Sequence, residues 1–334
     1  MTSPEVSIIV PCYNEEQHIR GLLDAITSQT YPINKMEVVV ADGMSTDLTR
    51  DKIEEFSETH PELTVQLINN TKRNIPSALN LAIKAAKGKY IVRLDAHSLP
   101  DKNYVNTCIQ HLKLDKAENV GGIWVIQPSN ETAIAIAIAA AAAHPLGVGG
   151  AQYRDPKASA AYVDTVPFGS YRKDYLIELG LYDESLLSNE DYELNARIRT
   201  RDGRIFLDPA IRCTYFARHN LSALSKQYFR YGYWKFQMLK RYPGSILMRQ
   251  FLPPLFVMTL MCLLVLGVFN SIFLWVFLFT ATLYLSSVFV GTYLVSNSGK
   301  LSIILHLLMS ISIATMHFSW GTGFILSPIL GIFR

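Results

Sequence analysis

Residues 6–42 read VSIIVPCYNEEQHIRGLLDAITSQTYPINKMEVVVAD, and this stretch decides the fold. Two short runs rich in Val and Ile, at 6–10 and 36–41, enclose a longer segment at 15–30 that reads as a helix. Short β-branched runs are typical of buried strands. Strand, helix and strand in this order predict a βαβ unit with parallel strands.

The same alternation continues to about residue 95. Further strands are expected at 63–68 and 90–95, and further helices at 46–59 and 76–87. Pro76 suits the first turn of the last of these helices. In parallel sheets the ligand lies beyond the carboxyl ends of the strands. We therefore examined which polar side chains follow the expected strands.

Asp95 and His97 follow the strand expected at 90–95. Side chains two residues apart on an extended segment point the same way, so both could hold one divalent cation. A carboxylate and an imidazole suit Mn²⁺ or Mg²⁺, with phosphate oxygens completing the coordination. Asp42 ends the second strand, where it either caps an Asp-Gly turn or accepts a hydrogen bond from a nucleotide.

Two adjacent acids, Glu190 and Asp191, lie in the segment SNEDYELNARIRTRDG at 188–203. Ser188 or Asn189 could cap a helix whose first turn holds both acids, where the helix dipole favours negative charge. That role alone explains the pair. The other interpretation is that one carboxylate is a general base that takes a proton from a hydroxyl.

The C-terminal part of the chain has the composition of a membrane region. The chain has 334 residues, of which 49% are hydrophobic, and a mean hydropathy of +0.17. Residues 209–334 hold ten Lys and Arg but no acid, and 250–299 hold no charged residue. Spans are expected at 252–269 and 271–295. Residues 301–333 form either one span or a span broken near Gly321, Gly323 and Pro328.

The distribution of charge also predicts the orientation. Basic residues cluster between 226 and 249, just before the first span, which favours a cytoplasmic location for everything before it. We therefore expect a multi-pass protein of the inner (cytoplasmic) membrane. The N-terminus has no basic segment of the kind that opens a signal peptide. The net charge of +3 does not indicate a nucleic-acid partner.

One further segment, AIAIAIAAAAA at 133–143, is too short to span a bilayer. It predicts either a buried helix with small side chains or a helix that faces the membrane or the acceptor. The four cysteines show neither zinc-site spacing nor a disulfide framework.

Four motifs, taken in order, resemble the family-2 glycosyltransferases with the GT-A fold. They are VSIIVPCYNEE, VVVADGMSTDLT, the segment from NTKRNIPS to YIVRLDAH, and FGSYRKDYLIELGLYDESLLSNEDYELNARIRTRDG. The run QYFRYGYWK at 227–235 resembles the Gln-x-x-Arg-aromatic motif of membrane-bound members. Within the family, the chain is most similar to exopolysaccharide glucosyltransferases of the succinoglycan type.

The resemblance implies an α/β GT-A fold, with a Rossmann-like mixed sheet and flanking helices, followed by a transmembrane helical region. The implied divisions are a cytoplasmic catalytic domain (1–221), basic amphipathic juxtamembrane helices (222–250) and a region of two to three spans (251–334). It implies an inverting transfer from a UDP-sugar to a polyprenyl-pyrophosphate-linked glycan, with Mn²⁺ or Mg²⁺ as cofactor. The oligomeric state is left open.

The resemblance also implies roles for single residues. Asp191 would be the catalytic base. The donor would be bound by Pro11, Tyr13, Glu15, Asp42, Arg73 and Asp95. The acceptor and its pyrophosphate would be bound by Glu190, Gln227, Arg230, and Tyr231 or Trp234. The metal would be held by Asp95 and His97, with His219 as a further ligand, although the family more often has Asp where this chain has His97.

Other activities on the same fold are alternatives. A polyprenyl-phosphate sugar synthase uses an acceptor that is already ionised, so it needs no base, and Asp191 argues against it. A processive polysaccharide synthase would need a channel, for which two to three spans are few. A catalytically inactive scaffold would not need Asp42, Asp95 and Asp191 together.

Overall fold

A computed structural model describes residues 3–243, 248–295 and 302–330. They form two compact units. Unit 1 is Met1–Val125 with Pro156–Tyr215, and unit 2 is Ile126–Asp155 with Phe216–Arg334. Residues 126–155 are thus grouped with the C-terminal helices.

Unit 1 is built on a mixed sheet, as expected for the GT-A fold. The strand order is β3-β2-β1-β4-β8-β6-β9-β5, and β7 pairs with β9. Strands β3, β2, β1 and β4 are parallel, whereas β8 runs antiparallel to β4. The strands are β1 (Val6–Cys12), β2 (Met36–Asp42), β3 (Thr64–Asn69), β4 (Tyr90–Arg93), β5 (Leu99–Pro100), β6 (Asn119–Gln127), β7 (Ala161–Tyr162), β8 (Ser170–Arg172) and β9 (Ile205–Phe216).

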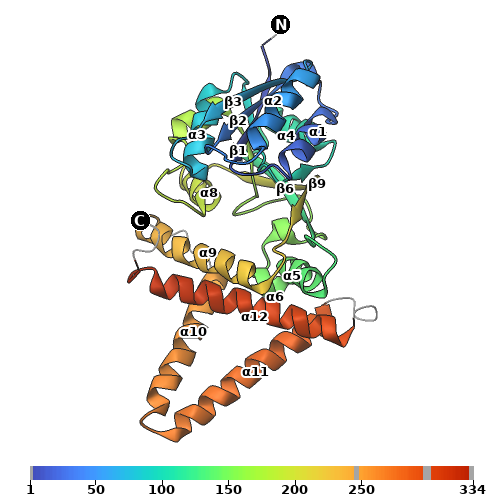
Figure 1. The fold of residues 1–334 in the computed structure, drawn as a ribbon. Coiled ribbons are helices and arrows are strands. Elements are labelled where there is room, and N and C mark those ends of the chain that lie inside the picture. Colours follow the sequence, from blue (N-terminus) through green and yellow to red (C-terminus); the bar gives the residue numbers. More distant parts are fainter. Residues whose placement is uncertain (1–2, 244–247, 296–301, 331–334) are drawn as a thin grey trace. The chain divides into compact units, whose positions relative to one another are not determined.

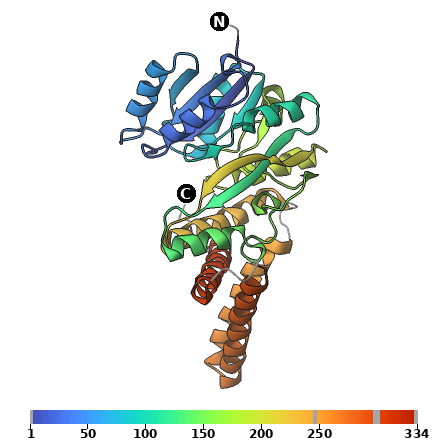
Figure 2. The ribbon, with the colours of Figure 1, turned by 90° about the vertical axis from the view of Figure 1, so that its right-hand side faces the viewer.

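Helices flank this sheet (Figures 1 and 2). In α1, Ile19, Leu22, Leu23 and Ile26 are buried, which is the spacing of one apolar helix face. Pro76 lies in the first turn of α3, as predicted. The helices of unit 1 are α1 (Ile19–Thr27), η1 (Ile33–Lys35), α2 (Thr49–Thr59), α3 (Ile75–Ala85), α4 (Tyr104–Lys113), α7 (Lys173–Leu179) and α8 (Glu190–Thr200).

Helix α1 begins at Ile19, later than the predicted residue 15, and the residues before it contact the start of α2. The backbone N–H groups of Glu15 and Glu16 donate to Thr49 Oγ1 at 2.8 Å and to Asp47 Oδ2 at 3.2 Å. The loop after β1 is therefore tied to the start of α2. This brace fixes two of the loops that follow the parallel strands.

Unit 2 is helical. Its elements are α5 (Ala133–Ala143), α6 (Pro145–Val148), η2 (Gln152–Arg154), α9 (Leu221–Arg241), α10 (Met248–Gly267), α11 (Ser271–Val295) and α12 (Ile303–Leu326). Among the described residues, α10, α11 and α12 are long and apolar enough to cross a membrane. The Ala-rich segment forms α5, most of which is buried, so the prediction of a buried helix is confirmed.

Helix α12 is continuous through Gly321 and Gly323, where the sequence left a break open. It packs along α9 within unit 2 (Figure 1). A Cβ atom on Gly323 would lie 2.1 Å from the Phe229 carbonyl oxygen, and one on Gly232 would lie 2.1 Å from that of Trp320. Gly232 of α9 and Gly323 of α12 therefore allow close contact between the two helices, and Gly323 does not break α12.

Candidate active site

The register of unit 1 brings the ends of three parallel strands to one edge of the sheet. Cys12 of β1 lies beside Asp42 of β2, and Ile9 of β1 lies beside Arg93 of β4. The loops after β1, β2 and β4 therefore leave the sheet at the same edge. This is the edge at which the sequence predicted the donor site.

A buried arginine, which the sequence analysis did not single out, organises this edge. Arg93 donates from Nε to Asp95 Oδ1 at 3.1 Å and from Nη2 to Glu190 Oε1 at 3.0 Å. Its Nη1 donates to Asp191 Oδ1. The predicted base Asp191 and the predicted donor ligand Asp95 are thus brought together, although they are far apart in the sequence. Glu190, predicted as an acceptor ligand, joins the same cluster.

The cluster changes the acidity of Asp191. The pKa of Asp191 is raised to about 8, chiefly by burial and also by the nearby charges of Glu190 and Asp95, while Arg93 opposes the shift. Three carboxylates face one guanidinium, and this excess of negative groups disfavours the ionised form of Asp191. A carboxylate with a pKa near neutrality is well matched to general-base work.

Helix α8 begins at Glu190, and both acids lie in its first turn, as predicted. The predicted capping bond is absent: the N-cap residue is Asn189, but its side chain makes no capping hydrogen bond. Asn189 has a φ of 65°, a left-handed conformation that Asn tolerates better than most residues. Capping alone therefore does not account for this turn.

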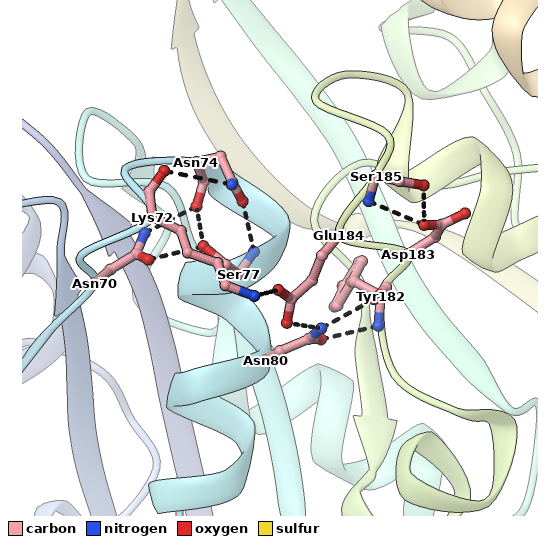
Figure 3. A network of polar contacts seen from close by, with 9 residues as sticks. All are labelled: Asn70, Lys72, Asn74, Ser77, Asn80, Tyr182, Asp183, Glu184 and Ser185. Carbon is pink, nitrogen blue, oxygen red and sulfur yellow. Dashed lines mark hydrogen bonds and ion pairs between the residues drawn. The ribbon is translucent and has the colours of Figure 1, made fainter. Parts of the chain in front are cut away.

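The segment that leads to α8 is held by polar contacts to α3 (Figure 3). Asn80 accepts from the Tyr182 N–H and donates to the Tyr182 carbonyl, both at 2.9 Å. Glu184 accepts from Asn80 at 3.0 Å and from Lys72 at 2.6 Å. Residues 182–184 are thereby tied to the helix and loop that follow β3.

Asp95 and His97 offer a carboxylate and an imidazole for a cation, but not a complete shell. His97 Nδ1 contacts Glu15 Oε1 at 2.9 Å. A carboxylate on one ring nitrogen fixes the tautomer that presents the other nitrogen to a metal, so these residues fit a divalent cation. Within the described ranges, no group of three or more His, Cys, Asp or Glu side chains could hold a metal. His219 is exposed in unit 2.

The predicted nucleotide ligands differ in how far their side chains are exposed to solvent. Tyr13 is about half exposed, Arg73 is exposed, and Pro11 is buried in β1. Asp42 is fully buried: it accepts from Arg50 Nη1 at 2.7 Å and from Ser45 Oγ at 2.5 Å. The turn-cap interpretation of Asp42 is therefore supported by its contact with Ser45, and Arg50 is a charged residue at this edge that the sequence analysis missed.

The remaining predicted acceptor ligands lie on α9 of unit 2. Gln227 is buried and donates to the Tyr231 hydroxyl at 2.8 Å, whereas Arg230 is exposed. Trp234 is also buried, with its ring 5.6 Å from that of Tyr233. Of the two aromatic candidates, the more accessible is Tyr231.

Comparison with known proteins identifies relatives over most of the chain. A transferase of Methanococcus voltae, named dolichyl N-acetyl-α-D-glucosaminyl phosphate 3-β-D-2,3-diacetamido-2,3-dideoxy-β-D-glucuronosyltransferase, is 28% identical over 71% of this chain and 74% of its own. The succinoglycan biosynthesis protein ExoA of Rhizobium meliloti is 30% identical over 76% of each chain.

Solved structures share the fold. A mannosyltransferase of Pyrobaculum calidifontis, in complex with GDP-Man and Mn²⁺, superposes with a TM-score of 0.62 at 20% identity and covers 98% of this chain and 88% of that chain. Residues 1–349 of S. aureus TarS, in complex with UDP-GlcNAc, give a TM-score of 0.53 at 17% identity over 99% and 93% of the two chains.

The profile of a protein family indicates the same kind of protein as the fold and the relatives do. The profile of glycosyl transferase family 2 matches residues 7–180, which include β1, β2, β4 and the Asp95 region. This match, together with the GT-A-like sheet and the relative at 30% identity, identifies the chain as a member of glycosyl transferase family 2.

Proposed function

We propose that this glycosyltransferase moves a sugar from a UDP-sugar to a hydroxyl of a polyprenyl-pyrophosphate-linked glycan, in one displacement that inverts the anomeric centre. The observation that carries the proposal is the cluster in which Asp191 and Asp95 share Arg93. It brings a carboxylate of raised pKa beside the carboxylate at the end of the donor-side strand.

The residues act as follows. Asp191 accepts the proton of the attacking hydroxyl as the bond to the anomeric carbon forms and the bond to the diphosphate breaks. Tyr13, Glu15 and Arg73 would bind the nucleotide, and the buried Asp42 lies at the same end of the sheet, so the leaving diphosphate would depart on that side. Inversion requires that Asp191 and the leaving group lie on opposite faces of the bound sugar.

Asp95 and His97, with Glu15 behind the imidazole, would hold Mn²⁺ or Mg²⁺. Such a cation supplies charge stabilisation to the diphosphate as it leaves. His219 is a further candidate ligand on the sequence resemblance alone. The Mn²⁺ complex of the mannosyltransferase supports metal use in this fold. The two donor complexes contain different nucleotides, GDP-Man and UDP-GlcNAc, so the nucleobase of the donor is to be tested.

A lipid-linked acceptor explains the helices of unit 2. The M. voltae relative is named for a dolichyl-linked acceptor, and ExoA for succinoglycan biosynthesis. Gln227 and Arg230 of α9 are then the ligands for the acceptor pyrophosphate, and Tyr231 or Trp234 contacts the acceptor. Arg230 is exposed on the helix that precedes the first candidate span, where anionic headgroups are met.

The proposed location is the inner membrane, with residues 1–221 as a cytoplasmic catalytic domain, 222–250 as a juxtamembrane region and 251–334 in or on the membrane. The packing within unit 2 supports two crossings, α10 and α11. The C-terminal part of α12 packs against α9: Ser225 and Ser319 hydroxyls lie 2.9 Å apart, and Gln237 donates to Ser327 Oγ at 2.9 Å. Because α9 carries Lys and Arg, it belongs at the interface, and so does the helix beside it.

The test is incubation of the purified protein with Mn²⁺ or Mg²⁺, membrane lipid extract and a panel of UDP-sugars, with GDP-mannose as comparison, followed by mass spectrometry of the lipids. The proposal expects one hexose added to a lipid-linked glycan. Addition to polyprenyl phosphate itself would instead indicate a polyprenyl-phosphate sugar synthase, and a ladder of products would indicate a processive synthase.

A further inference from the structure

Arg93 is placed rigidly, by contacts on both sides of its strand. In β4 it lies beside Ile9 of the parallel strand β1, and its backbone N–H donates to the Gly169 carbonyl at 3.1 Å. Its side chain is 3% exposed. A site built on a central strand is held more precisely than one on a loop. Arg93 can therefore act as a fixed reference for groups that approach it from other elements.

The three carboxylates reach Arg93 from two parts of the chain, one of them the segment that follows its own strand. Asp95 follows β4, whereas Glu190 and Asp191 come from the first turn of α8. Each meets a different nitrogen of the guanidinium. Only arginine offers donors in this planar fork; a lysine ammonium cannot meet three carboxylates in the same geometry. The contacts therefore set a distance and an angle between α8 and the donor-side strand, in addition to compensating charge.

The other end of the same segment is fixed independently. Asn80 and Lys72 hold residues 182–184 through the contacts in Figure 3. Between residue 184 and α8 only a short loop remains, and it ends at Asn189 in its left-handed conformation. The Asn80 contacts fix the backbone of residues 182–184, but they do not reach the carboxylate of Asp191. The position of that carboxylate is therefore set by its contact with Arg93.

We infer that Arg93 is a positioning residue for glycosyl transfer, which holds the base Asp191 at a set place relative to Asp95 on the donor side. The inference rests on the proposed function, in which Asp191 is the base. Arg93 itself touches neither donor nor acceptor in this scheme. A displacement of about 1 Å in a reacting group can lower turnover by ~10²-fold, so loss of the fork should be felt in kcat.

The test is a double-mutant cycle on kcat, with Arg93→Lys and Asp191→Asn made singly and together. Arg93→Lys should lower kcat by about 10²-fold in the wild-type background and by less than about threefold when Asp191 is already Asn, because the group that it positions has lost its function. A merely structural role predicts the same loss in both backgrounds, and that result would overturn the inference. Radiolabelled donor keeps the slow variants measurable.

A matched control comes from α8 itself. Arg197 donates from Nη2 to Glu193 Oε2 at 2.8 Å and from Nη1 to the Leu179 carbonyl at 2.7 Å, so it is another forked arginine on a carboxylate of this helix. Arg197→Lys should lower the melting temperature but leave kcat within a few-fold. If it lowers kcat as much as Arg93→Lys, a general loosening of α8 explains both and the inference fails.

Two further outcomes separate the inference from the proposed function. If Asp191→Asn alone keeps wild-type turnover, the base assignment fails, and the inference fails with it. If Asp191→Asn is slow but the double variant loses the product of the two single-variant losses in kcat, the inference fails while the proposed function stands. Should Arg93→Lys not fold, Arg93→Gln combined with Glu190→Gln removes one charge of each sign, and the same comparison is made with and without Asp191→Asn.

Discussion

Replacing Glu190 by Gln tests whether the negative charge of this neighbour raises the pKa of the proposed base, Asp191. The pKa of Asp191 is raised to about 8 by burial and by the charges of Glu190 and Asp95, against the opposing effect of Arg93. A like charge at roughly 4–6 Å shifts a pKa by about 1 to 3, so Glu190→Gln should bring the pKa of Asp191 down to about 5 to 7. At pH 6 the ionised fraction of Asp191 should then rise from about 1% to at least about 10%.

The assay is kcat/KM against pH between about 5.5 and 9, with Mg²⁺ saturating. In the wild type, activity should rise with pH to a plateau above about 8, because the base must be ionised. In Glu190→Gln, the rising limb should move to lower pH even if the plateau falls. Glu193→Gln is the control: Glu193 is buried on the same helix but contacts Arg197, so the limb should stay. A limb that does not move in Glu190→Gln would refute the reasoning.

The raised pKa of Asp191 also predicts how the stability of the folded protein changes with pH. Between about pH 4 and pH 8 the folded protein holds a proton on Asp191 that the unfolded chain has released. This group therefore favours folding less as pH rises through that window. Asp191→Asn should raise the melting temperature relative to wild type more at pH 8 than at pH 5. An equal difference at both pH values would contradict the raised pKa.

EDTA should abolish transfer and Mn²⁺ or Mg²⁺ should restore it; His97→Ala should lose activity with little change in melting temperature, and full activity in excess EDTA would exclude the metal. Glu15→Gln should raise the Mn²⁺ concentration for half-maximal activity by about 10- to 100-fold, because it removes the carboxylate behind His97. A reporter fused at the C-terminus should read cytoplasmic if only α10 and α11 cross, whereas an external reading would require a third crossing. Gly323→Ala should lower the melting temperature by several degrees, because its Cβ would lie 2.1 Å from the Phe229 carbonyl; Gly21→Ala, whose Cβ would meet its nearest neighbour at 3.5 Å, should not.

Much of the fold could be predicted because local patterns and tertiary structure agree. Val and Ile runs form the buried strands β1 and β2, and Pro76 opens α3. The first turn of α8 contains both predicted acids. Boundaries were less certain where side chains from elsewhere bind the backbone, as Asp47 and Thr49 do at residues 15–16.

The centre of the site could not be predicted for a physical reason. Arg93 ends a short strand of otherwise apolar and aromatic residues, and a charged side chain there gives no local indication of its partners. Two of those partners are on α8, and only the folded sheet brings them to Arg93. Arg50 was missed in the same way, because its contact with Asp42 depends on how α2 packs. Long-range ion pairs of this kind leave no periodic pattern in a sequence.

The central claim is that Asp191 takes a proton from a sugar hydroxyl, and one measurement tests it most directly. Asp191→Asn keeps the shape of the side chain but cannot accept the proton. With UDP-sugar and lipid-linked acceptor, kcat should fall by ~10²–10⁴ while donor affinity stays nearly unchanged, since the lost interaction belongs to the transition state. A folded variant that retains more than about a tenth of wild-type turnover would have lost less than the ~10²-fold expected on removal of a general base. That result would contradict the account and favour a phosphate acceptor.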